Sequence, residues 1–236
     1  MPDTLPTAAD LEALTAFDTP TICNALEIVA PERRGQGYTT HAALCGFPQM
    51  KPIVGYARTA RIRAKLPPNV SAQESRKLRG EYYRYVDAGA KPSVICIQDL
   101  DGLDAGYGAF WGEVHSAIHK GLGASGLVTD GSIRDIDQWA SDFQFLAAKV
   151  APSHAWADIV DFAGEIEVLG MRVRSGDIVH ADRHGAVVVP VATVRALPDA
   201  ARLLGRREGR ILAVARAEGC TAERLIEAFG QADQIH

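Results

Sequence analysis

The sequence is poor in cysteine and has no long apolar run, and these shortages exclude several classes of protein. Its four cysteines lie far apart and form no Cys-X-X-Cys pair, so neither a structural zinc site nor a disulfide framework is expected. No stretch approaches the roughly 18 apolar residues of a transmembrane helix, so no membrane contact is expected. The first residues also lack the basic and apolar regions of a signal peptide, so the expected location is cytoplasmic.

An excess of positive charge is also missing. The net charge is −4 at pH 7, which gives no general attraction to nucleic acid. Arg58, Arg61 and Arg63 could form a basic patch, but only Tyr56 is interleaved with them, and a solvated strand face is the preferred interpretation. A small anionic substrate would therefore need cations placed locally around its site.

What is present is the pattern of one α/β domain. The 236 residues are 47% apolar and 23% charged, and no linker divides them. Periodicity predicts a surface loop over 31–52 and a short helix near Arg134 after a turn at 130–131. It also predicts helices over 8–30, 73–86, 113–120 and the last 45 residues, and strands over 53–64, 93–97, 127–129, 145–150 and, as several short pieces, 158–189.

The first segment that could form a binding or catalytic site runs from Gly108 to Ala117. Its glycines precede a helix, so the free backbone N–H groups of the first helical turn can bind a carboxylate or phosphate. Glu113 lies in that turn. Taken alone, it could equally serve only to complement the helix dipole.

The second segment runs from Gly126 to Asp135, where a buried strand is followed by adjacent opposite charges. Arg134 offers a planar fork that suits the carboxylate or carbonyl of a keto acid, and Asp135 offers a hard oxygen ligand for magnesium or manganese. A surface ion pair at a helix start is the alternative. Twenty residues lie between Glu113 and Arg134, enough for one helix and one strand, so both carboxylates should emerge at one edge of the sheet.

These motifs resemble the 4-hydroxy-4-methyl-2-oxoglutarate aldolase family, which includes the regulator of ribonuclease activity A (RraA). Its catalytic members carry an acidic residue, twenty intervening residues and Arg-Asp, and Glu113, Arg134 and Asp135 match this signature. The segments 19–26 and 175–190 match as well, so the resemblance covers roughly residues 15–190.

The resemblance implies an α/β fold, an α-β-β-α sandwich of swivelling-domain type. It implies a single domain over 1–236, with its core at about 15–190 and a C-terminal helical extension over 191–236. It further implies a homotrimer or homohexamer with sites at the subunit interfaces.

The resemblance also implies a metal-dependent lyase that cleaves 4-hydroxy-2-keto acids to pyruvate through an enolate, with oxaloacetate decarboxylation as a side activity. Asp135 would hold a divalent cation, partly through water, with Glu113 near it. Magnesium is the expected cation, and manganese and cobalt are alternatives. Arg134 would contact the pyruvyl group, and backbone N–H groups of Gly112, Glu113, Val114 and His115 would hold its carboxylate.

Some features depart from this family. His115 stands where an apolar residue is usual, Trp111 and His119 are also unusual, and the stretch 66–92 is longer than expected. We therefore treat His115 as a residue that could set substrate specificity. His115 and His119 are spaced i, i+4, but without the acidic residue of an HExxH motif they do not predict a zincin.

Other interpretations stay open at the level of sequence. A lysine Schiff-base aldolase would use Lys149, although no pocket that lowers its pKa is evident. A non-catalytic regulator that binds a ribonuclease is the second alternative. His180 and His184 are expected on the surface of a hairpin, and Glu208 could enter a neighbouring subunit's site.

Overall fold

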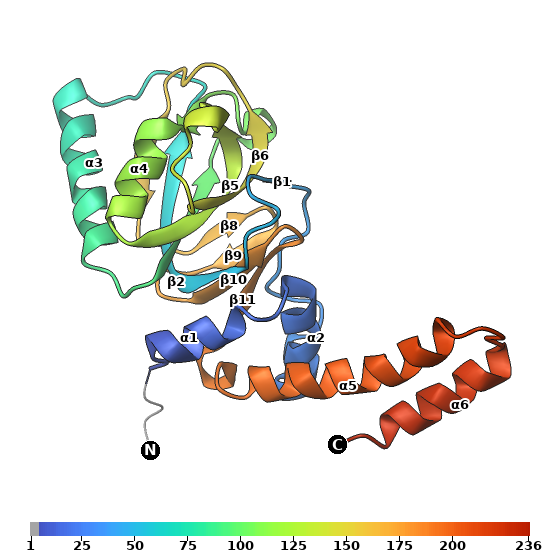
Figure 1. Ribbon diagram of the computed structural model, residues 1–236. Coiled ribbons are helices and arrows are strands. Elements are labelled where there is room, and N and C mark those ends of the chain that lie inside the picture. The colour runs from blue at the N-terminus through green and yellow to red at the C-terminus, as the bar shows by residue number, and fades with distance from the viewer. Residues whose placement is uncertain (1–4) are drawn as a thin grey trace.

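A nine-stranded curled sheet organises residues 5–236, which are the part of the chain that the computed structural model describes. The strand order is β1-β6-β5-β3-β2-β10-β11, with β4 added beside β5 and β7 beside β2 (Figure 1). A separate hairpin is formed by β8 and β9. The strands are β1 (Leu44–Cys45), β2 (Ile53–Arg63), β3 (Ser93–Asp99), β4 (Ala109–Trp111), β5 (Ala124–Ile133), β6 (Gln144–Val150), β7 (Asp158–Phe162), β8 (Ile166–Val168), β9 (Met171–Val173), β10 (Ile178–Asp182) and β11 (Gly185–Val189).

The four central strands β6, β5, β3 and β2 are parallel, and antiparallel strands β1, β10 and β11 complete the ends. Parallel strands are buried on both faces, which explains their nearly continuous apolar sequences. The expectation of one wet face on β2 holds only at the end of the strand, where the Arg63 side chain is 58% exposed. Thr59 is fully buried and donates its hydroxyl to the Gly164 carbonyl, while Arg61 is half-buried against Asp161.

Six α-helices accompany the sheet within the described residues, and several begin where the sequence supplies a cap. The side chains of Thr7, Asp18 and Ser71 accept hydrogen bonds from the first turns of α1, α2 and α3. The N-terminus of α4 has Gly112 and no side-chain cap, which leaves N–H groups there for another partner. The helices are α1 (Ala8–Leu14), α2 (Thr19–Val29), α3 (Ala72–Asp87), α4 (Glu113–Gly121), α5 (Leu197–Ala215) and α6 (Ala222–Asp233).

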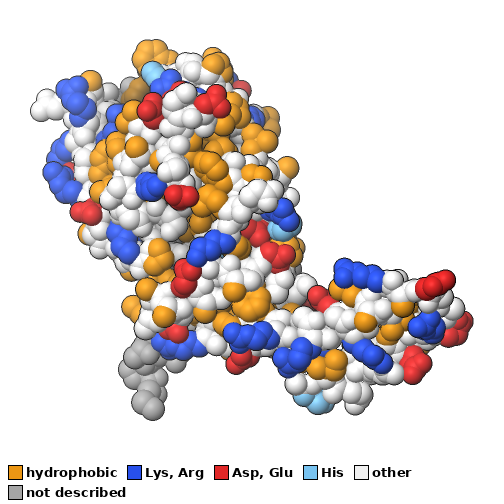
Figure 2. Space-filling model, in the orientation of Figure 1, with side chains coloured by type: hydrophobic (Ala, Val, Ile, Leu, Met, Phe, Trp, Pro, Cys, Tyr) orange, Lys and Arg blue, Asp and Glu red, His pale blue; other side chains and the backbone are white. Residues whose placement is uncertain are grey.

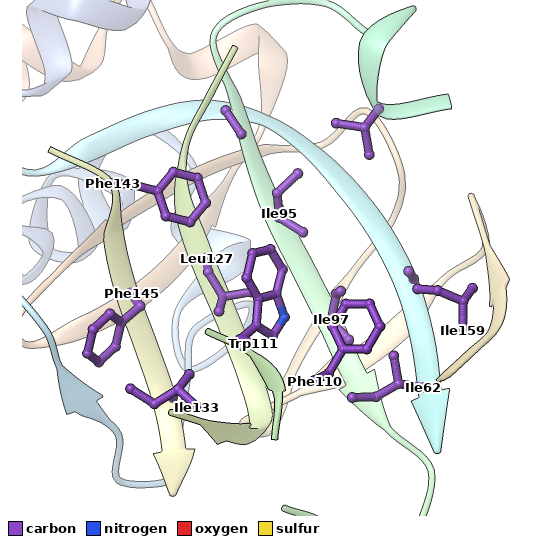
Figure 3. Packing of buried hydrophobic residues seen from close by; sticks show 14 of the residues in the cluster. Ile62, Ile95, Ile97, Phe110, Trp111, Leu127, Ile133, Phe143, Phe145 and Ile159 are labelled. Carbon is purple, nitrogen blue, oxygen red and sulfur yellow. The ribbon is translucent and has the colours of Figure 1, made fainter. Parts of the chain in front are cut away.

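Three apolar clusters hold these layers together. The first joins one face of the sheet to α3 and contains the buried rings of Trp111 and Phe143 (Figure 3). The second lies between the sheet and the β8–β9 hairpin, and the third lies under α1, α2 and α5. The predicted α/β fold class is confirmed as a mixed α/β domain with a curled sheet and six helices.

The predicted turn at 130–131 and the helix near Arg134 are wrong. Strand β5 continues to Ile133, with a register shift between Thr129 and Ser132 that its neighbours absorb. The Thr129 hydroxyl accepts from the Gly131 N–H within this irregular stretch. Only a single 3-10 turn follows, over Ile136–Gln138. The bulge explains why turn-forming residues stand inside a strand.

The predicted surface position of His180 is also wrong. The β10–β11 hairpin forms as expected, but the His180 side chain is fully buried under α1 and α2. Its Nε2 faces the carbonyl oxygens of Leu14 and Phe17 at 3.2 and 3.1 Å, and its Nδ1 lies 3.0 Å from the Thr19 hydroxyl. His180 thus ties the hairpin to the N-terminal helices.

Helices α5 and α6 pack against each other and form an arm that extends away from the sheet (Figure 1). Hydrophobic side chains lie among acidic and basic ones along this arm (Figure 2), and Ile226 and Phe229 are exposed there. Neither these helices nor any other in residues 5–236 has the length and apolarity needed to cross a membrane.

Candidate functional site

The short strand β4 brings the two candidate segments together. It runs parallel to the end of β5, with Trp111 paired to Ile133, and the Arg134 N–H donates to the Trp111 carbonyl over 2.9 Å. The residues that follow each strand are therefore neighbours, although 20 positions separate them in the sequence. This pairing places Glu113, at the start of α4, beside Asp135.

Gly112 allows the close approach of these two segments. A Cβ atom at this position would lie 2.4 Å from Asp135 Oδ2 and 3.2 Å from Arg134 Cγ. Asp135 Oδ2 also lies 3.4 Å from the Glu113 amide nitrogen, a long hydrogen bond, and 3.5 Å from Arg134 Nε. The Asp135 backbone is left-handed, with φ of 54°, which turns its carboxylate back toward α4.

A cavity of about 240 Å³ opens at this junction. Its volume lies below the range typical of drug-sized ligands, so it suits a small molecule. Of the predicted site residues, Gly112, Val114, His115, Arg134 and Asp135 line it, whereas the Glu113 side chain is exposed and does not. The lining is completed by Arg79, Ala109, Phe110, His154 and Ala157.

His115 contributes a neutral imidazole to the cavity wall. Burial, and to a smaller extent the nearby guanidinium groups of Arg79 and Arg134, lower its pKa to about 4. Its ring centroid lies 4.3 Å from that of Phe110, and its Nδ1 is 3.5 Å from the Tyr83 hydroxyl. At neutral pH, His115 can therefore exchange hydrogen bonds with a ligand without adding charge.

His119 lies behind His115 and has a structural role. It is fully buried, with Nδ1 2.7 Å from the His115 carbonyl and Nε2 2.9 Å from the Tyr82 hydroxyl. A carbonyl can only accept, so Nδ1 carries the proton and Nε2 accepts from Tyr82. Both nitrogens are thus occupied, which argues against the pair as metal ligands. Burial lowers the pKa of His119 to about 3.

We expect His119 to make stability depend on pH. The folded chain keeps it neutral down to about pH 3, whereas the unfolded chain protonates it near 6.5. Because the unfolded state binds the extra proton between these values, the free energy of unfolding falls as the pH falls through that window. In His119→Gln the fall between about pH 6 and pH 4 should be shallower by about 1.4 kcal/mol per pH unit. Urea denaturation at both pH values measures this, and an unchanged slope would contradict it.

The carboxylates of Asp135 and Glu113 are the groups that could hold a cation here. Residues 5–236 contain no group of three or more His, Cys, Asp or Glu side chains arranged for a metal ion, so a zinc site with three protein ligands does not fit. Magnesium keeps several waters and is usually held by one or two carboxylates together with oxygens of the substrate. Asp135 lines the small cavity, and Glu113 is exposed at the start of α4 with its amide nitrogen 3.4 Å from Asp135 Oδ2. One carboxylate in the cavity and a second acidic residue next to it fit that donor set.

Comparison with known proteins identifies the family. A family profile described as RraA-like, Aldolase/RraA, matches residues 19–188. The chain belongs to the RraA-like family. No curated protein matches this RraA-like chain. Its family includes aldolases as well as RraA inhibitors, so membership alone assigns neither role.

Three solved structures are similar to this RraA-like protein. An uncharacterized protein from Pseudomonas syringae pv. tomato str. DC3000 is 22% identical with a TM-score of 0.72, over 98% of this chain and 97% of that chain. A structure described under novel cellulases from gut-associated microbes is 18% identical with a TM-score of 0.71, over 89% and 90%. RraAS2 from Streptomyces coelicolor, an unusual member of the RNase ES inhibitor RraA family, is 22% identical with a TM-score of 0.67, over 88% and 98%. At these identities the likeness concerns the fold alone.

Two other candidates from the sequence lie outside the cavity of this RraA-like protein. Lys149 is exposed on β6, and its ammonium donates to the Ala105 carbonyl over 2.5 Å. Glu208 is exposed on α5. Sequence reasoning missed Arg79 and His154, which do line the cavity. Nothing in the pattern of the charged helix α3 separates Arg79 from its other arginines, because only the fold reveals which one points at the site.

Proposed function

We propose that this protein is a divalent-metal-dependent lyase that cleaves 4-hydroxy-2-keto acids to pyruvate, with oxaloacetate decarboxylation as a side activity. The observation that carries the proposal is the junction of β4 and β5. It gathers the uncapped N-terminus of α4, the Arg134 guanidinium and the Asp135 carboxylate at one cavity. Trimeric or hexameric assembly is part of the same proposal.

Separate groups of the chain bind the carboxylate and the adjacent keto oxygen of the substrate. The free N–H groups of Val114 and His115 hold the substrate carboxylate, and Arg134 donates to the keto oxygen. A magnesium-type cation held by Asp135 and Glu113, when bound, supplies Lewis-acid polarisation of that oxygen.

The polarised keto group then accepts the electron pair of the bond that breaks. Glu113, which is exposed beside the cavity, orients a water molecule that takes the proton from the C4 hydroxyl and later returns it to C3. The C4 oxygen becomes a carbonyl, the C3–C4 bond breaks, and its electron pair enters the pyruvate enolate. Arg134 stabilises the enolate oxygen, and protonation at C3 gives pyruvate.

The first test is pyruvate release from 4-hydroxy-4-methyl-2-oxoglutarate and from oxaloacetate, measured by a coupled assay. With magnesium present we expect turnover of at least one of them. Excess EDTA should reduce the rate to the uncatalysed background, and added magnesium should restore it. Turnover that persists in EDTA would contradict metal dependence, and trapping of pyruvate by borohydride on Lys149 would support the Schiff-base alternative instead.

A non-catalytic role is the second candidate, because one similar structure belongs to a family of RNase inhibitors. The cavity, where Arg134 lies against Asp135 and Arg79 adds a second cation, favours the lyase, since an inhibitor needs no such cavity. A folded protein that turns over neither substrate and has no affinity for magnesium would favour the inhibitor.

A further inference from the structure

An apolar groove lies beside the candidate site, where the β2–α3 and β6–β7 connections run across the top of the molecule (Figure 1). The Trp156 N–H donates to the Ala64 carbonyl over 3.0 Å, which joins the two connections. The groove between them has a volume of about 490 Å³. Its lining includes Leu66, Val70 and Trp156, which are 68, 53 and 54% exposed. Large apolar side chains gathered at a surface in this way mark a binding site.

The groove continues the cavity of the site. A further hollow, of about 600 Å³, has walls in common with both. It shares Arg79, His154 and Ala157 with the cavity of the site, and Val70 and Trp156 with the apolar groove. A ligand chain that leaves the cavity past Arg79 and His154 therefore enters the groove.

The connection that carries His154 and Trp156 is fixed to the site by β4. The Ala109 N–H donates to the Ser153 carbonyl over 2.8 Å. A Cβ atom at Gly108 would lie 2.5 Å from the His154 carbonyl oxygen, so the two segments are in close contact. Because β4 also positions the candidate site, the groove and the site are held in a constant relation to each other.

Charged side chains along this path are paired with each other. Arg79 Nη2 donates to Asp158 Oδ1 over 2.9 Å, and Asp158 lines the groove. At the other side of the groove, Arg63 Nη1 lies 3.9 Å from Asp101 Oδ1. Paired charges give little attraction to a charged group of a ligand, so the path beyond the cavity suits an uncharged chain.

We propose that this groove binds the distal half of the substrate, and that this half is an uncharged apolar chain. The preferred substrates are then 2-keto acids with a long aliphatic tail. This inference rests on the proposed function in one respect, since that function puts the keto-acid end at Arg134 and α4. The apolar tail leaves the small cavity past Arg79 and covers Val70 and Trp156, and removing these side chains from water supplies the binding energy.

The first test uses 2-keto acids that differ only in tail length. Titration calorimetry with magnesium present compares 2-oxobutanoate, 2-oxohexanoate, 2-oxooctanoate and 2-oxodecanoate, which have no C4 hydroxyl and are not cleaved. Affinity should rise roughly fourfold for each methylene that enters the groove. Val70→Ser and Trp156→Ser should weaken this dependence. Ile28→Ser, which removes an exposed apolar side chain on α2, should keep it.

A second readout comes from Trp156 itself. Of the three tryptophans, Trp111 and Trp139 are 0 and 7% exposed, so quenching by acrylamide reports mainly on Trp156. Saturating 2-oxodecanoate should protect this ring from acrylamide, whereas saturating 2-oxobutanoate should not. Equal quenching with both acids would contradict the proposed position of the tail.

An affinity that does not depend on tail length, or a dependence that Val70→Ser retains in full, would overturn the inference. A second copy of the chain is the rival occupant of the groove. Trp156 would then be protected without ligand and become exposed on dilution, and that result would also overturn it. The binding readout separates this inference from the lyase proposal. Tail-dependent binding without cleavage of any aldol contradicts only the lyase, and metal-dependent cleavage without tail-dependent binding contradicts only the role of the groove.

Discussion

Replacing Arg134 by alanine should lower kcat/KM for pyruvate release by about 10²- to 10³-fold, the usual loss when a donor to a developing oxyanion is removed. In the proposed reaction, negative charge collects on the enolate oxygen, and Arg134 is the cation of the signature that faces it. The loss should appear mainly in kcat, because the interaction strengthens as the charge develops. Steady-state kinetics with oxaloacetate and with the aldol measure it.

The fold should tolerate this change. The Arg134 side chain is 38% exposed, and its backbone is held independently by the N–H bond to the Trp111 carbonyl. The free energy of unfolding should therefore change by only about 0.5 kcal/mol. Arg202→Ala is the matched control, because Arg202 forms only an exposed ion pair with Asp199 on α5 and its removal should leave kcat unchanged. An Arg134→Ala variant that cleaves at the wild-type rate would refute the assignment.

The sequence predicted those candidate site residues that are marked by a pattern of neighbouring residues. Glu113 follows a glycine at the start of a helix, and Arg134 and Asp135 follow a buried strand, so their chemistry could be inferred from their neighbours in the chain. The hairpin with its turn at 182–185 is likewise a local signal, and the structure pairs Asp182 with Gly185. Patterns of this kind are short-range, because capping, turns and strand burial depend on adjacent residues.

What the sequence could not reveal depends on contacts between distant segments. The bulge in β5 looks like a turn until β4 and β6 are known to continue the pairing on either side of it. His180 looks exposed because it lies next to the polar turn of its hairpin, yet α1 and α2 cover it. Arg79 resembles any other charged residue of a surface helix, and only the packing of α3 beside α4 brings it to the cavity.

Gly112→Ala should lower magnesium affinity, and with it activity, by roughly 10- to 100-fold while the protein stays folded. The Gly112 backbone is extended, with φ of −168°, so alanine causes no backbone strain. The new Cβ would instead meet Asp135 Oδ2 at 2.4 Å, the end of a side chain that can rotate away. The substitution therefore displaces the carboxylate assigned to the metal rather than the strands around it. Calorimetric titration with magnesium, together with thermal unfolding, measures both effects.

Gly121→Ala is the matched control, at the other end of α4. A Cβ atom at Gly121 would meet nothing within 4 Å, and the position is exposed. Alanine there should stabilise the helix by about 0.5–1 kcal/mol and leave magnesium affinity unchanged. The two single substitutions lie at opposite ends of α4, and only Gly112→Ala displaces the Asp135 carboxylate. If Gly112→Ala bound magnesium as tightly as the wild type, the Asp135 carboxylate would not be the ligand. Full activity would then require the cation to sit elsewhere, and the close approach of β4 to β5 would have only a structural purpose.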